Sequence, residues 1–129
     1  MQPIHITLNG CPRSKKNSMQ IVRHGNYSSL IPSKPYREYA KLCHAQIDDK
    51  LRKRIDIPCC VKGVYFMETH RKVDLGNLIN ATLDILVAEK VLLDDNCEIV
   101  VHHDGSRVYY DKECPRAEID IIPIARDVE

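Results

Sequence analysis

The chain of 129 residues contains no tryptophan and one phenylalanine, so its core must be built mostly from aliphatic side chains. With 43% hydrophobic residues it can still build one core, and its length fits a single domain over residues 1–129. It also lacks a signal-peptide pattern and an apolar run long enough to cross a membrane. These absences predict a cytoplasmic protein with no membrane partner.

The sequence lacks a strong excess of charge of either sign. The net charge is +1, so no global basic field would attract nucleic acid. A nucleic-acid partner would have to meet local patches, and basic residues do cluster at 13–16, 50–54 and 70–72. A charge run is also typical of a solvated face, so the clusters alone do not decide the function.

Cysteine is present, but without the spacing of a metal site. The six cysteines contain no C-x-x-C, and the adjacent pair Cys59-Cys60 suits neither a zinc knuckle nor an ordinary disulfide framework. We therefore expect reduced thiols that serve as small buried hydrophobic residues.

Hydrophobic periodicity predicts strands and helices in alternation. The expected strands cover residues 4–8, 60–69, 98–103, 107–110 and 117–122, the expected helices cover 35–52 and 75–89, and a short hairpin is expected around His24-Gly25-Asn26. This order implies a single small α/β (α+β) domain, in which two main helices pack on a small mixed or antiparallel sheet.

The stretch from Arg71 to Asp95 carries the most chemical information. Asp74 lies where a strand gives way to a helix, and Asp94-Asp95 follow that helix and a short apolar tail. Helix and tail can fold back, so we expect the two acidic sites to meet beside His70 at one end of the sheet. Mg²⁺ held by one to three carboxylates neutralises a phosphate and activates water, while basic residues grip a DNA backbone. The stretch therefore indicates metal-dependent cleavage of a phosphodiester.

Each of these features also has a plainer interpretation. Asp74 is a good helix N-cap, and Asp94-Asp95-Asn96 is an ordinary turn signal. Tyr109 and Tyr110 could stack on nucleobases, although tyrosines in strands are more often packing residues.

The same stretch resembles the signature of the RusA family of Holliday junction resolvases, small endonucleases encoded by phages and prophages. The family pattern is Asp-x-Asp-Asn-Leu, a lysine three residues after the Asn, a helix with an internal aspartate, and a closing Asp-Asp pair. This chain reads Asp74-Leu75-Gly76-Asn77-Leu78-Ile79-Asn80, then Asp84, then Asp94-Asp95. Residues 10–17, 33–39 and 115–121 are similar to three further family blocks, so the resemblance covers nearly the whole chain.

The resemblance implies a symmetric homodimer that uses Mg²⁺ or Mn²⁺ to cut four-way DNA junctions by paired nicks, in recombination and repair. It implies Asp74 and Asp95 as catalytic metal ligands, and Asp94 and Glu68 are further candidates for the metal. The candidate DNA-binding residues are Arg13, Lys15, Lys16, His70, Arg71, Lys72 and Asn77.

Two positions depart from the family pattern, because its second aspartate falls on Gly76 and its lysine falls on Asn80. Loss of a carboxylate weakens metal binding, and loss of one fixed charge at the reacting phosphate typically costs about 10²–10³ in rate.

Three interpretations of these substitutions stay open. If the strand continues extended to Asp74, then Glu68, His70 and Lys72 share its face and could replace the missing ligand and charge. Alternatively, the chain binds branched DNA without cutting it well. The third is a phage regulatory or interaction protein that uses only the fold and its dimer surface.

Overall fold

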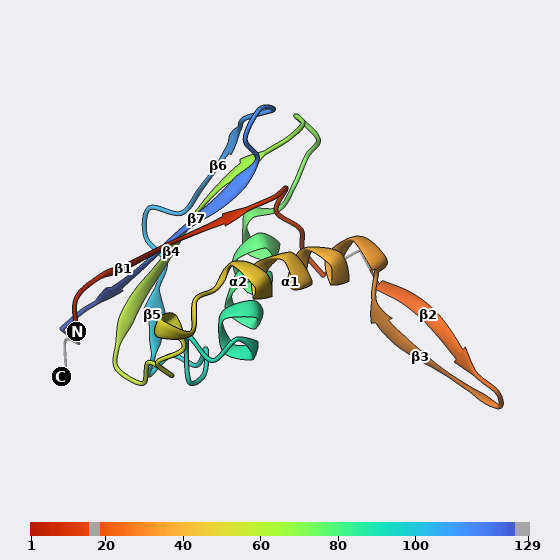
Figure 1. The fold of residues 1–129 in the computed structure, drawn as a ribbon, viewed down its shortest axis with the longest axis horizontal. Coiled ribbons are helices and arrows are strands. Elements are labelled where there is room, and N and C mark those ends of the chain that lie inside the picture. The colour runs from red at the N-terminus through yellow and green to blue at the C-terminus, as the bar shows by residue number, and fades with distance from the viewer. Residues whose placement is uncertain (16–18, 126–129) are drawn as a thin grey trace.

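The computed structural model describes residues 1–15 and 19–125 of the chain (Figure 1). Its elements are β1 (Ile4–Asn9), β2 (Met19–His24), β3 (Tyr27–Pro32), α1 (Lys34–Gln46), the 3-10 turn η1 (Asp49–Leu51), β4 (Cys59–Met67), α2 (Leu75–Ala88), β5 (Val100–His102), β6 (Arg107–Tyr110) and β7 (Arg116–Pro123). None of the helices within these described ranges is long and apolar enough to cross a membrane.

The main sheet is mixed and has the order β1-β7-β4-β5, with β6 also paired to β4. β7 runs antiparallel to both β1 and β4, whereas β5 and β6 run parallel to β4. β5 contacts the start of β4 at Cys59 and Cys60, and β6 contacts its end from Val64 to Met67. The predicted small α+β domain with a mixed sheet and two helices is confirmed.

One face of this sheet is buried beneath the helices. Alternate residues of β7, namely Ala117, Ile119 and Ile121, are fully buried, as the period of two in a strand requires. Buried residues of both α1 and α2 belong to the same hydrophobic core. A buried polar contact also docks α2, because the Tyr65 hydroxyl lies 2.6 Å from Thr82 Oγ1.

β2 and β3 form a separate two-stranded sheet that extends away from the domain (Figure 1). The predicted hairpin is therefore confirmed, and Gly25 supplies the positive φ that its turn requires. Ile21 and Leu30 face each other across the two strands and are 70% and 61% exposed. An isolated hairpin of two strands is at best marginally stable, and this one presents an uncovered apolar pair.

Three predicted boundaries need correction. α1 ends at Gln46 rather than at residue 52, because Ile47 turns extended to enter the core and the Asp48 side chain caps η1. β4 ends at Met67, so residues 68–74 form a loop and do not extend the strand. β5 covers 100–102 only, since the Asn96 carbonyl accepts hydrogen bonds from the Ile99 and Val100 amides in a turn.

Candidate functional site

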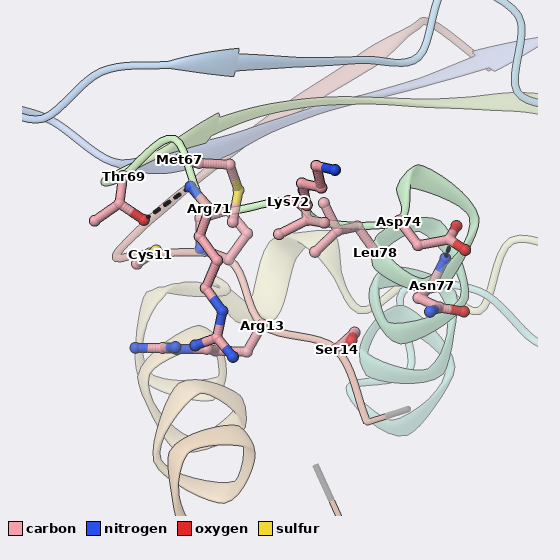
Figure 2. A pocket seen from close by; sticks show the side chains of 12 residues that line it. Cys11, Arg13, Ser14, Met67, Thr69, Arg71, Lys72, Asp74, Asn77 and Leu78 are labelled. Carbon is pink, nitrogen blue, oxygen red and sulfur yellow. Dashed lines mark hydrogen bonds between the residues drawn. The ribbon is translucent and has the colours of Figure 1, made fainter. Parts of the chain in front are cut away.

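A pocket of about 620 Å³ opens where β4 ends and α2 begins (Figure 2). The loop 11–14 forms one wall, and the loop after β4 together with the first turn of α2 forms the other. The lining residues are Cys11, Pro12, Arg13, Ser14, Met67, Thr69, Arg71, Lys72, Val73, Asp74, Asn77 and Leu78. We call this the basic pocket, because three of its side chains are cationic and one is anionic.

The charges in the basic pocket are separated. Figure 2 shows Arg13 and Arg71 at one end and Asp74 with Asn77 at the other, while Lys72 points away from Arg71. In residues 1–15 and 19–125, no carboxylate forms an ion pair with Arg13, Arg71 or Lys72. These cations therefore keep their charge available for an anionic ligand.

Lys15 lies apart from this group. Its ammonium forms an ion pair with Asp84 of α2 at 3.2 Å and lies 5.7 Å from the centre of the Tyr36 ring. The loop 11–15 is thus fastened to both helices, and Lys15 does not line the basic pocket. The next predicted DNA contact, Lys16, falls outside the described residues.

Asp74 caps helix α2, as its plainer interpretation predicts. Its carboxylate Oδ1 accepts a hydrogen bond from the Asn77 amide at 3.3 Å, and the side chain is exposed at the pocket rim. Gly76 is the second residue of α2, at the position where the family pattern has its second aspartate, and it adds no carboxylate to the rim. Asn80 is exposed one turn further along.

Asp94 and Asp95 lie at the other end of α2. The chain after α2 runs beside Ile55, whose amide donates to the Val91 carbonyl and whose carbonyl accepts from Leu93. Ile55 precedes β4, whereas Asp74 follows it, and the 14 residues of α2 span about 21 Å. The expectation that the two acidic sites meet at one end of the sheet is therefore wrong within one chain.

The Asp94 carboxylate is already engaged in its own turn. It accepts hydrogen bonds from the Asp95 amide at 2.7 Å and the Asn96 side chain at 3.0 Å, and these bonds hold its pKa below the usual value. Across the described ranges no cluster of three or more His, Cys, Asp or Glu residues could hold a metal ion. Among the residues that the structure describes, Asp74 is the only carboxylate lining the basic pocket, so this lining does not fit a resident Mg²⁺ site within one chain.

Local replacement of the missing groups also loses its geometric basis. It required an extended strand from Glu68 to Asp74, but β4 ends at Met67 and Glu68 is exposed. His70 stacks on Tyr110 with ring centres 3.7 Å apart and does not line the basic pocket. Of the proposed substitutes, Lys72 alone shares the pocket with Asp74.

A second hollow of about 290 Å³ adjoins the basic pocket and was not predicted. Met67, Thr69, Arg71 and Val73 line both. The sequence signal that could have indicated it is the pair of consecutive tyrosines on the short strand β6.

The thiols take no part in a disulfide, since all six cysteines are free. Cys43, Cys59 and Cys60 are buried, as expected of small hydrophobic residues, while Cys97 and Cys114 are exposed.

Comparison with known proteins does not assign the chain to a family. The chain matches no model of a known protein family, and no curated protein matches it.

Proposed function

We propose that this chain is a RusA-like protein that binds branched DNA, above all four-way junctions, and cuts it poorly. The observation that carries the proposal is the set of three cations around one pocket, Arg13, Arg71 and Lys72, which have no ion-pair partner among the described residues. Arg13 lies in the segment 10–17 that resembles a block of the RusA family, and Arg71 and Lys72 lie just before the signature that begins at Asp74. The proposal thus unites the family pattern with an independent feature of the surface.

Phosphate contacts are the physical basis of this binding. Each lysine or arginine that neutralises a phosphate releases condensed counterions, and this term dominates sequence-independent affinity. Because the net charge of the chain is only +1, its attraction for DNA has to be local. The basic pocket is a suitable place, since Arg71 and Lys72 lie on the loop between β4 and α2. Arg13 lies on the loop after β1, which the ion pair of Lys15 with Asp84 ties to α2.

Weak cleavage follows from the same geometry. Gly76 and Asn80 remove a carboxylate and a fixed positive charge, and Asp95 lies beyond the far end of α2. Loss of one group that stabilises the reacting phosphate typically lowers the rate by about 10²–10³. A regulatory protein without DNA affinity would instead show a neutral surface around Asp74, and the neighbouring cations argue against it.

We further propose that the protein acts as a homodimer, because two-fold symmetry lets each copy meet one of two opposed strands in a junction. The exposed pair Ile21 and Leu30 on the β2–β3 hairpin is where a second copy would pack. Light scattering after size exclusion should give twice the monomer mass for the unmodified protein. The variant Ile21→Lys/Leu30→Lys should have the mass of a monomer. A monomer mass for the unmodified protein would contradict the proposed dimer.

The binding proposal is tested with a fluorescently labelled four-way junction and a linear duplex of the same arm sequence, titrated by anisotropy over a range of salt concentrations. We expect the protein to prefer the junction. Arg13→Gln/Arg71→Gln should bind at least about ten-fold more weakly, with a salt slope lower by about two. Lys53→Gln is the matched control, because this exposed cation precedes β4 at the other end of the sheet.

Three results would contradict the proposal. The first is equal affinity for junction and linear duplex at moderate salt. The second is an equal loss of affinity in Lys53→Gln and in the double arginine variant, which would show that the basic pocket has no special part in binding. The third is absence of any DNA binding, which would leave the regulatory interpretation.

A further inference from the structure

The second hollow, lined by the same loop as the basic pocket, has a different chemistry. Besides the four shared residues, it is lined by His70, Val108, Tyr109 and Tyr110. Three of its apolar side chains, Val73, Val108 and Tyr110, are between 36% and 43% exposed. An apolar, aromatic surface thus lies beside a cationic one, and Arg71 borders both.

The tyrosine that could act as a platform is Tyr110. It pairs with Met67 across β4 and β6, so its ring lies on the side of the sheet that faces the helices. His70 stacks on this ring at a centre-to-centre distance of 3.7 Å and an interplanar angle of 27°. The histidine holds the ring in place, while 43% of the tyrosine stays open to solvent.

Tyr109 has a different role, because successive residues of a strand point to opposite faces. Its ring packs against Phe66 with centres 5.5 Å apart, and the Arg116 guanidinium lies 3.8 Å from the Phe66 ring centre. Tyr109 is therefore a packing residue of the outer face, even though it borders the hollow.

We propose that the Tyr110–His70 pair stacks an unpaired nucleobase whose flanking phosphate is held by Arg71 and Arg13. Aromatic side chains next to a cationic groove are the usual platform for unstacked bases, and such stacking depends little on sequence. This inference rests on the proposed DNA binding and narrows its substrate class. Perfect duplex keeps its bases stacked inside, so the platform selects branch points and single-stranded segments.

The absence of tryptophan from the chain gives a direct test. Tyr110→Trp introduces a single indole at the platform, and its fluorescence is quenched when a base stacks on it. The matched control is Tyr27→Trp on the hairpin, because Tyr27 is also exposed and also stacked on a histidine, His24, at 5.0 Å. Each variant is titrated with a four-way junction, an oligothymidine and a linear duplex.

We expect the junction and the oligothymidine to quench the indole of Tyr110→Trp, and the linear duplex to bind without quenching it. The control indole should stay bright with all three. In addition, Tyr110→Leu should bind oligothymidine about ten-fold more weakly than the unmodified protein while keeping its affinity for linear duplex.

Equal quenching of the two indoles, or quenching by linear duplex as strong as by the junction, would overturn the inference. So would a fluorescence change of Tyr110→Trp with protein concentration alone, since a second copy would then cover the platform. Junction binding that leaves the indole of Tyr110→Trp bright defeats this inference and keeps the proposed function. If the unmodified protein binds none of the three DNA probes, both this inference and the proposed function are wrong.

Discussion

A Cβ atom on Gly76 would lie 3.2 Å from Asp74 Oδ1. A carboxylate introduced at position 76 would therefore lie beside that of Asp74, and two such groups repel each other unless a cation lies between them. This spacing makes Gly76 the position that decides whether the rim of the basic pocket can hold a divalent ion.

Gly76→Asp should make the stability of the protein depend on Mg²⁺. At about 10 mM Mg²⁺ and a dissociation constant near 1 mM, binding adds about 1.4 kcal/mol, which raises Tm by a few degrees. Thermal denaturation with Mg²⁺ and with a chelator measures the effect. Gly76→Asn is the matched control, because it changes size and helix propensity without adding charge, and it should respond as little as the unmodified protein. An equal Mg²⁺ response in all three proteins would refute the prediction.

The cap at Asp74 gives a separate prediction for stability. Asp74→Ala should lower the free energy of unfolding by about 1 kcal/mol, because the Asn77 amide loses its acceptor. Asp74→Ser should recover most of this loss, since a hydroxyl can accept the same hydrogen bond. Urea denaturation distinguishes the two variants. If Ser and Ala are equally destabilising, the carboxylate contributes through its charge and not through the cap.

The contact between Tyr65 and Thr82 should be important for docking α2 on β4. Thr82→Val removes the partner at 2.6 Å and leaves the buried tyrosine hydroxyl with the Leu78 carbonyl at 3.3 Å. We expect a loss of about 1–3 kcal/mol in the free energy of unfolding. A double-mutant cycle with Tyr65→Phe should give a smaller loss for the pair than the sum of the single losses. Additive losses would show that the two hydroxyls do not interact.

Sequence patterns predicted the elements whose signal is local. The alternation of Ala117, Ile119 and Ile121 fixed β7, and the apolar stripe through Leu78, Thr82 and Leu86 fixed α2. The end of β4 was harder to place, because residues 68–72 are polar or charged and carry no alternation that separates strand from loop. Helix α1 was predicted too long, since Ile47 continues its apolar period although its backbone is extended.

The candidate site was predicted in part, for a similar reason. Arg71, Lys72 and Asp74 are close in sequence, so their shared pocket follows from local structure, and Arg13 joins them through the turn after β1. The position of Asp95 depends on the pairing of Leu92 with Ile55, and no local sequence pattern predicts this long-range contact. The ion pair of Lys15 with Asp84 is likewise a tertiary contact.

We propose that the protein binds four-way junctions and cuts them poorly, because Gly76 and Asn80 replace the aspartate and the lysine of the family pattern. Cleavage of a labelled four-way junction in Mg²⁺ or Mn²⁺, by the unmodified protein and by Gly76→Asp/Asn80→Lys at saturating protein, tests it most directly. We predict that both bind, and that the double variant nicks opposed strands at least about 10²-fold faster. Equal cleavage rates for the two proteins would contradict the account.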